Sequence, residues 1–126
     1  YKIIDFINIL SKKIYKPNEF LLFYPNISVC CGIGRPEIFV RMLKAEGFEI
    51  KHKIFYPDHY WYRIKDLKMW KEKIAYPIVM TYKDIVKIYL LMDKFETKYF
   101  DKIYCCNIKL EINEGVDIWK ELVSSL

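Results

Sequence analysis

The stretch Cys30–Tyr60, CCGIGRPEIFVRMLKAEGFEIKHKIFYPDHY, decides the fold that this sequence predicts. It opens on the end of an apolar run, Ile27–Cys31, which is typical of a buried strand in a parallel sheet. The run stops at the turn Gly32-Ile33-Gly34. Pro36 then suits the first turn of a helix, where the N–H that proline lacks would have no intrahelical partner. The pattern predicts a strand, a glycine turn and a helix.

The second half of the stretch predicts that helix and another strand. Apolar residues at helical spacing indicate a helix over Pro36–Glu46, and Gly47 is the expected residue at its C-terminal cap. Residues Phe48–Phe55 alternate as a strand does. Lys51 and Lys53 indicate that one face of this strand meets solvent, so we expect it at an edge of the sheet.

Upstream of the stretch, the sequence predicts one helix and one short strand. An apolar stripe indicates a helix over Tyr1–Tyr15. That helix would pack on this domain or on upstream chain, or would lie on a membrane surface as a basic amphipathic helix. Residues Phe20–Tyr24 predict a short strand after a break at Lys16-Pro17-Asn18.

Downstream, helices and strands continue to alternate. The expected elements are a helix over Ile64–Ile74, a strand over Ile78–Met80, a helix over Asp84–Leu91, a strand over Ile103–Ile112 and a last helix that carries Val116, Trp119, Leu122 and Val123. Such alternation, without a repeat or a long linker, is typical of α/β folds. We predict a single α/β domain over residues 1–126, built as a small three-layer α/β/α sandwich with a mostly parallel sheet.

The composition is that of a globular domain. The 126 residues are 53% hydrophobic and 29% charged, which is enough apolar surface for a core. The net charge of +5 comes from basic residues spread along the chain, so nucleic-acid binding is not predicted. Charged residues interrupt the first apolar stretch, which does not resemble a signal peptide. Because the chain begins with Tyr1, we expect it to be part of a longer protein.

The four cysteines form two adjacent pairs, Cys30-Cys31 and Cys105-Cys106. Neighbours on a strand point to opposite faces of a sheet, so an adjacent pair does not readily share a metal ion. We interpret them as small buried residues of a reducing compartment and expect no metal site. The alternative is a zinc site that uses the histidines.

Three loops carry residues that suit chemistry: Gly32–Gly34, Pro57–His59 and Thr81–Asp84. Each follows a predicted strand, and ligands of open α/β sheets bind beyond the carboxyl ends of the strands. We therefore expect the loops to meet at one edge of the sheet. The glycines do not form a P-loop, because the spacing G-x-x-x-x-G-K-[ST] occurs nowhere in the chain.

His59 is the main catalytic candidate, and Asp58 beside it could orient the imidazole. Contacts with substrate or phosphate are predicted at six further positions: Gly32, Gly34, Arg35, Thr81, Lys83 and Asp84. Glycine amides and the two cations favour anions, and Thr81 and Asp84 belong with Lys83 to a set near the same crevice. The simpler interpretation is also open. The glycines would then serve only the turn, Thr81 or Asp84 would cap a helix, and the other side chains would be exposed or structural.

Three motifs in this order resemble the C-terminal half of tetraacyldisaccharide 4'-kinase, the lipid A kinase family. They are GIGRPEIF at Gly32–Phe39, FYPDH at Phe55–His59 and TYKD at Thr81–Asp84. The family usually shows T-T-x-K-D at the third motif, and Met80 here stands in place of the first threonine. The resemblance covers Val29–Leu91 well and the tail to Leu126 loosely.

The resemblance implies transfer of a phosphoryl group from ATP, with Mg²⁺, to the 4'-hydroxyl of a tetraacylated glucosamine disaccharide-1-phosphate. It implies work at the cytoplasmic face of the inner membrane of a Gram-negative bacterium. The implied partners are the lipid A precursor, the membrane surface and the protein's own N-terminal P-loop domain. That domain would bind most of the ATP and Mg²⁺, so this chain alone is expected to be inactive. His59 would assist a catalytic base, an aspartate of the other domain, with Asp58 positioning it.

Two alternatives come from other classes of function. The chain could be a self-standing, non-catalytic α/β module that binds a partner or an anionic ligand, which the missing P-loop and the altered third motif favour. It could also be a small metal-dependent hydrolase built on Asp58, His59 and His52, although these residues do not make a convincing set of ligands.

Overall fold

The computed structural model describes residues 1–110, in which six strands form one sheet in the order β2-β1-β6-β5-β3-β4. β3 pairs in parallel with β4 and β5, and β5 pairs in parallel with β6. β1 runs antiparallel to both β2 and β6. The strands are β1 (Lys2–Asn8), β2 (Ile14–Tyr15), β3 (Asn26–Cys31), β4 (Glu49–Phe55), β5 (Ile78–Thr81) and β6 (Ile103–Lys109).

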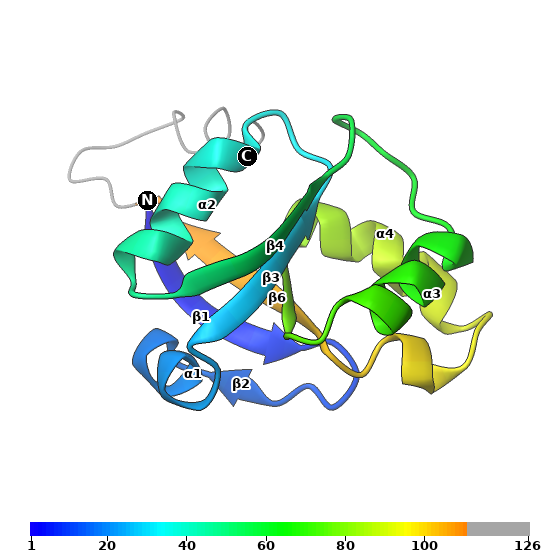
Figure 1. Ribbon diagram of the computed structural model, residues 1–126, viewed down its shortest axis with the longest axis horizontal. Helices are drawn as coiled ribbons and strands as arrows, with labels where there is room; N and C mark the ends of the chain where they lie inside the picture. The colour runs from blue at the N-terminus through cyan, green and yellow to red at the C-terminus, as the bar shows by residue number, and fades with distance from the viewer. Residues whose placement is uncertain (111–126) are drawn as a thin grey trace.

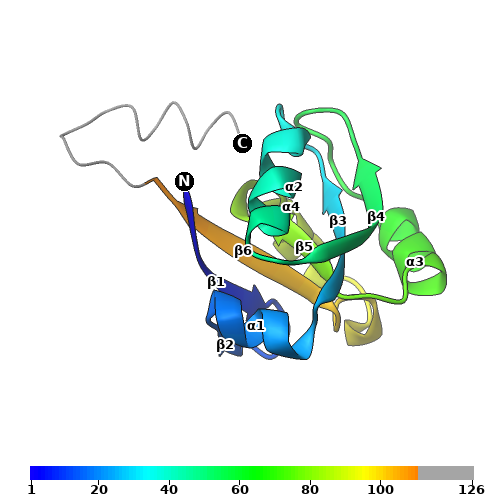
Figure 2. The same ribbon diagram turned by 60° about the vertical axis from the view of Figure 1, so that its left-hand side comes forward.

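Helices cover both faces of this sheet. They are α1 (Pro17–Phe23), α2 (Pro36–Ala45), α3 (Ile64–Lys73), α4 (Tyr82–Met92) and the short 3-10 helix η1 (Thr97–Tyr99). Figures 1 and 2 show α1 and α2 on one side of the sheet and α3 and α4 on the other. The three-layer α/β arrangement predicted from the sequence is therefore confirmed.

The two cysteine pairs show how the sheet divides the core. Cys31 and Cys106 belong to the core cluster beneath α1 and α2, whereas Cys30 and Cys105 belong to the cluster beneath α3 and α4. All four are buried free thiols, and burial raises the pKa of each well above its ordinary value. The interpretation of the cysteines as buried strand residues is confirmed.

The stretch around the glycine turn folds as its sequence predicts. β3, α2 and β4 follow one another at the expected places, and β4 is an edge strand. Gly47, just beyond α2, has a φ of +109°, the left-handed conformation that favours glycine at a helix C-terminus. A Cβ there would also lie 3.1 Å from Leu21 Cδ2 of α1.

The two upstream predictions are wrong. The segment expected to form a helix over Tyr1–Tyr15 forms β1 and β2, because β1 pairs along its length with β6 and completes the sheet. Isoleucine-rich sequence suits a strand as well as a helix, so long-range pairing decided between them. The strand expected over Phe20–Tyr24 is helix α1, in which Pro17 occupies the first turn and is not a break.

The downstream predictions agree with the structure as far as it is described. α3, β5 and α4 lie within two residues of their expected bounds, and β6 begins at Ile103 as expected. The expected last helix and the end of the strand predicted to reach Ile112 lie outside the described residues. Among residues 1–110, no helix is long and apolar enough to cross a membrane.

Ser28 on β3 provides a test of the core. Its side chain is fully buried, and its Oγ has no hydrogen-bond partner among the described residues. A buried hydroxyl without a partner is unfavourable, so we expect Ser28→Ala to leave the free energy of unfolding unchanged or to raise it by about 1 kcal/mol. Urea denaturation of the two proteins measures this. Thr81→Ala is the matched control, since it removes a buried hydroxyl that has a partner. Equal losses in both variants would contradict the prediction.

Candidate active site at the carboxyl edge of the sheet

The three loops selected from the sequence meet at the carboxyl edge of the parallel strands. Gly32–Gly34 follows β3 and Pro57–His59 follows β4. The third segment is not a loop, because Thr81 ends β5 and Tyr82–Asp84 open α4 directly. β5, β3 and β4 are neighbours in the sheet. The backbone N–H of His59 donates to the carbonyl oxygen of Gly32 at 3.3 Å, and that of Tyr56 donates to Cys31 at 2.8 Å. These bonds join the loop after β4 to the turn after β3, so the expected convergence of the loops is confirmed.

Asp84, in the first turn of α4, ties the start of that helix to the same turn. Its side chain is 1% exposed. Oδ1 accepts hydrogen bonds from the Gly32 N–H at 2.9 Å and the Tyr62 hydroxyl at 2.8 Å, and Oδ2 accepts one from Thr81 Oγ1 at 3.0 Å. One buried carboxylate therefore holds three segments that are far apart in sequence.

Burial sets the protonation of this cluster. Desolvation raises the pKa of Asp84 above its ordinary value, although its three donors and the charge of Lys87 act against the shift. Desolvation also raises the pKa of Tyr62 far above its usual range, and the charge of Asp84 adds to this effect. The Tyr62 hydroxyl consequently keeps its proton and remains a donor to Asp84.

Gly32 is required here because the chains approach too closely for a side chain. A Cβ at this position would lie 3.0 Å from the carbonyl oxygen of Pro57, 3.0 Å from Tyr60 Cβ and 3.4 Å from the Tyr62 hydroxyl. Two of these contacts are at the limit of what a real Cβ shows, and one is with backbone, which cannot move aside cheaply. The first glycine of the turn thus serves the packing of the loop that carries His59.

Above this buried layer, His59 and Asp58 face solvent. His59 has a φ of +65°, a left-handed conformation that is uncommon for residues other than glycine. Its side chain is 75% exposed, and its Nε2 lies 3.5 Å from Asp58 Oδ2. The Lys83 ammonium lies 3.4 Å from Asp58 Oδ1. The loop therefore presents an imidazole, a carboxylate and an ammonium side by side.

The charges of this exposed group influence one another. Partial desolvation would raise the pKa of Asp58, but the hydrogen bond and charge of Lys83, together with His59, outweigh it and lower that pKa. Asp58 is therefore ionised at neutral pH and can orient the imidazole of His59. Such a carboxylate–imidazole pair can hold or pass on a proton.

Aromatic side chains support the loop from below. Tyr56 and Tyr60 stack with ring centroids 4.4 Å apart, and Tyr62 packs edge-on against both and against Trp70 of α3. The hydroxyl of Tyr60 donates to Asp66 at 3.0 Å, which fixes this wall to the start of α3. Most of the aromatic cluster is thus packing.

The six predicted contact positions divide into an exposed and a buried set. Gly34 and Arg35 are exposed at the start of α2, and the Lys83 side chain is 29% exposed. Gly32, Thr81 and Asp84 are buried. Thr81 makes no side-chain cap on α4, and Asp84 is occupied by protein donors. The polar groups of this buried set face the protein interior, so our proposal of phosphate contacts below rests on the exposed set.

Sequence reasoning missed three contributors to the site. The Tyr62 hydroxyl binds Asp84, Asp66 holds Tyr60, and the Lys87 ammonium donates to the Tyr60 carbonyl oxygen at 2.9 Å. The sequence could have indicated Lys87, because residues four apart on a helix share a face and Lys87 follows Lys83 by four positions. No local pattern marks the two tertiary contacts of Tyr62 and Asp66.

His52 does not join this site. It is exposed on β4, and its ring lies 6.1 Å from that of Tyr76. Within residues 1–110, no three histidine, cysteine, aspartate or glutamate side chains come together as metal ligands. The described residues therefore provide no ligand set for the hydrolase alternative.

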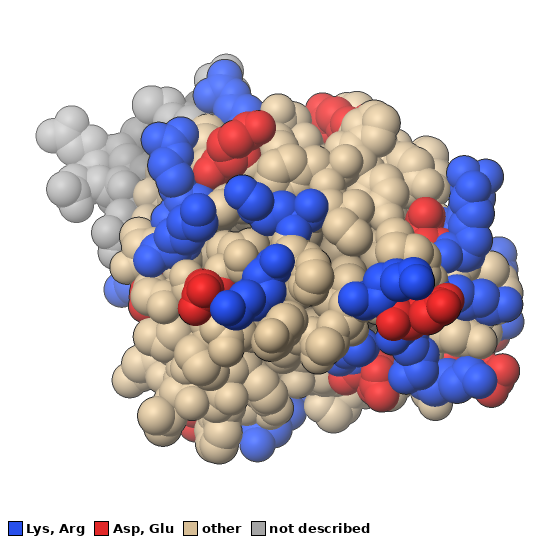
Figure 3. All heavy atoms as spheres, in the orientation of Figure 1, with Lys and Arg blue, Asp and Glu red and all other residues tan. Residues whose placement is uncertain are grey.

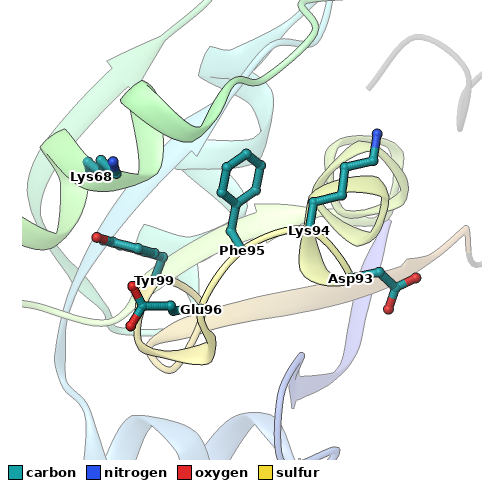
Figure 4. A pocket seen from close by; sticks show the side chains of 6 residues that line it. All are labelled: Lys68, Asp93, Lys94, Phe95, Glu96 and Tyr99. Carbon is teal, nitrogen blue, oxygen red and sulfur yellow. The ribbon is translucent and has the colours of Figure 1, made fainter.

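A pocket away from this site is a weaker candidate for binding a ligand. It is open, has a volume of about 490 Å³ and lies where α4 leads into η1, at the opposite edge of the sheet. Its lining residues are Lys68, Asp93, Lys94, Phe95, Glu96 and Tyr99 (Figure 4). Two cations and two acids share its wall, so it favours neither sign of ligand. Figure 3 shows basic and acidic side chains interspersed over one face of the molecule, without a continuous basic patch.

Asp84 gives the site its first test. Asp84→Ala would leave the Gly32 N–H and two hydroxyls without an acceptor, so we expect the free energy of unfolding to fall by about 2–4 kcal/mol. Urea denaturation measures this loss. The control is Asp58→Asn at the exposed carboxylate, for which we expect little change in stability. If both variants lose stability equally, the hydrogen bonds of Asp84 do not hold the site together.

The raised pKa of Asp84 predicts the sign of a pH effect. Because the folded protein binds this proton more tightly than the unfolded chain, the contribution of the group is full below its ordinary pKa of 3.8. It is lost as the pH rises through the folded pKa. We expect the stability advantage of the wild type over Asp84→Asn to shrink as the pH rises from 3.8 through the raised pKa, measured by urea denaturation at several pH values. An advantage that grows with pH would mean that the three donors outweigh desolvation.

Comparisons with known proteins agree with this set of motifs. The family described as Tetraacyldisaccharide-1-P 4'-kinase matches residues 11–125. A tetraacyldisaccharide 4'-kinase of Psychrobacter cryohalolentis is 37% identical over 97 residues, which is 75% of this chain and 21% of the relative. One of Alcanivorax borkumensis is 35% identical over 71 residues, and one of Legionella pneumophila (strain Corby) is 30% identical over 94 residues. These two matches cover 56% and 75% of this chain, and 20% and 25% of the relatives.

The chain thus spans between a fifth and a quarter of the length of the curated relatives it matches. No solved structure matches it. The family match covers the glycine turn, the histidine loop and the Thr81–Asp84 motif, which the fold brings to one edge. The chain therefore belongs to the tetraacyldisaccharide 4'-kinase family.

Proposed function

We propose that this chain is the C-terminal, acceptor-side part of a two-domain lipid A 4'-kinase. Its partner would be an N-terminal P-loop domain of the same protein, which binds most of the ATP and Mg²⁺. The reaction is transfer of the γ-phosphoryl group of ATP to the 4'-hydroxyl of a tetraacylated glucosamine disaccharide-1-phosphate. The family match supports the kinase class, and the missing P-loop spacing supports the division of labour.

The observation that carries this proposal is the placement of His59. Its imidazole is exposed at the carboxyl edge of the sheet, while its backbone is held by Gly32 and its Nε2 lies beside Asp58. A histidine that served the packing of the loop would have its ring packed or bonded to the core, and a merely solvated one would need no carboxylate beside it. An exposed ring on a fixed loop suits a group that meets a partner outside this domain.

In the proposed reaction the 4'-oxygen attacks the γ-phosphorus and ADP leaves with the bridging oxygen. The hydroxyl proton passes to a carboxylate of the other domain, and His59 orients that carboxylate and stabilises its charge. Asp58 keeps the imidazole in the required orientation, and Lys83 holds Asp58 ionised. Phosphoryl transfer depends mainly on positioning and charge, which is what these residues supply.

The exposed set at the start of α2 would face the phosphates. α2 is a ten-residue helix with Pro36 in its first turn, and Arg35 lies at its N-cap. The positive end of its helix dipole and the Arg35 guanidinium both favour an anion. Gly34 and Lys83 would complete the surface that faces the N-terminal domain. We assign no step to Mg²⁺ on this chain, because the described residues offer no group of ligands for it.

The lipid substrate places the reaction at a membrane, and we propose the cytoplasmic face of the inner membrane. The isolated chain would not turn over ATP.

The competing hypothesis is a self-standing module that binds a partner or an anionic ligand. It predicts binding by the isolated chain that His59→Ala leaves unchanged.

The test is His59→Ala in the full-length kinase. We expect kcat for phosphate transfer to the lipid to fall about 100-fold, the usual scale for losing a group that assists proton transfer, with little change in KM for ATP. Transfer of labelled phosphate from ATP to the disaccharide lipid measures both constants.

His52→Ala is the matched control, because His52 is the other histidine of the chain and lies away from the site on β4. It should retain the parental kcat. If His59→Ala also retains it, His59 has no catalytic role and the binding-module hypothesis gains.

A further inference from the structure

Helix α4 exposes a row of large apolar side chains, which we name the α4 ridge. Its members are 37–63% exposed: Tyr82, Val86, Tyr89 and Leu90. They lie at positions i, i+4, i+7 and i+8, so they occupy one side of the helix. Isolated exposed apolar residues are ordinary, but a continuous row of them marks a surface that something covers.

The opposite side of α4 is buried in the core. Asp84, Ile85 and Ile88 are at most 1% exposed, and Leu91 and Met92 pack against the same cluster. The helix is therefore apolar around most of its circumference. A helix of that kind is normally buried on all sides, but among residues 1–110 only one side of α4 is covered.

Cations border the ridge on both sides. Lys83 and Lys87 lie on the side toward the His59 loop, and the Lys12 ammonium lies 4.4 Å from the Tyr89 ring centroid on the other. The only acidic residue within α4 is Asp84, which is buried. Asp93 follows only at its C-terminal cap. The exposed surface of the helix therefore offers apolar groups and positive charge.

Trp61 extends this surface toward the site. Its side chain is 65% exposed, and the Lys87 ammonium lies 5.2 Å from its ring. Tryptophan and tyrosine rings beside lysines, around a centre of valine and leucine, are the composition that favours the boundary between lipid headgroups and acyl chains. The lysines beside the ridge would attract anionic headgroups, and the exposed acid next to Lys83, Asp58, is paired with it.

We propose that the α4 ridge docks on a bilayer that contains anionic phospholipid. This inference rests on the proposed function. Docking of the ridge would place the His59 loop at the level of the lipid headgroups, where an acylated substrate resides. The geometry fits, because Tyr82 and Lys83 begin the helix directly after β5, beside Asp58. The eleven residues of α4 give a contact of roughly 16 Å along the membrane.

A rival apolar surface lies on α1. Leu22 and Phe23 are 80% and 59% exposed there, and Figure 3 shows few charged side chains over α1, at the lower left. α1 leads into the amino end of β3, at the edge of the sheet opposite His59. A bilayer on α1 would therefore hold the site away from the lipid, and this surface provides the matched control.

The experiment measures binding of the full natural chain to vesicles by flotation. One set of vesicles contains phosphatidylethanolamine and phosphatidylglycerol, and the other contains only phosphatidylcholine. Val86→Glu/Leu90→Glu changes the ridge, and Leu22→Glu/Phe23→Glu changes α1 by the same charge. We expect the ridge variant to lower binding to anionic vesicles about tenfold or more, and the α1 variant to retain it. Thermal unfolding followed by circular dichroism checks that each variant is folded.

Three outcomes would overturn the inference. The wild type could fail to bind anionic vesicles, the α1 variant could lose binding while the ridge variant keeps it, or the ridge could mediate only a dimer, seen by sedimentation. His59→Ala separates this inference from the proposed function, because it should bind vesicles like the wild type. Vesicle binding lost with the ridge while transfer survives loss of His59 would reject only the catalytic assignment.

Discussion

The buried carboxylate of Asp84 is the interaction on which the arrangement of the site depends. It accepts hydrogen bonds from the turn after β3, from Tyr62 in the loop after β4 and from Thr81 at the end of β5. A buried carboxylate is costly unless hydrogen-bond donors surround it. The position of Asp84 therefore depends on its three donors, and the positions of these donors depend on Asp84. α2 and α4 leave neighbouring strands toward opposite faces of the sheet. Asp84 joins the start of α4 to the turn that leads into α2.

The residues at this edge of the sheet form two layers, one buried with Asp84 and one exposed above it. The lower layer of Gly32, Tyr62, Thr81 and Asp84 is buried and serves geometry. The upper layer of Asp58, His59 and Lys83 is at least partly exposed and supplies charge and proton-binding groups. The motifs shared with the 4'-kinase family contain members of both layers. Under the proposed function, a residue in such a motif would serve the reaction directly or hold the loop that does.

Helix α4 links the two parts of the proposed function. Its first turn contributes Thr81 as N-cap, Lys83 and Asp84 to the site, and its outer side carries the α4 ridge. A surface that attracts lipid and a site that acts on lipid would then share one rigid element. Their separation would be fixed by helix geometry, and no flexible linker would lie between them.

The sequence by itself determined the elements whose signals are local. Gly32–Gly34, Pro36 and Gly47 place β3, α2 and β4 because turn and cap conformations depend on the residues that adopt them. Tertiary structure decided the rest. β1 is a strand only because β6 lies beside it, since its isoleucines suit a helix equally. Asp84 resembled a phosphate ligand in sequence, yet its three donors bury it, because burial depends on contacts between segments that no local pattern encodes.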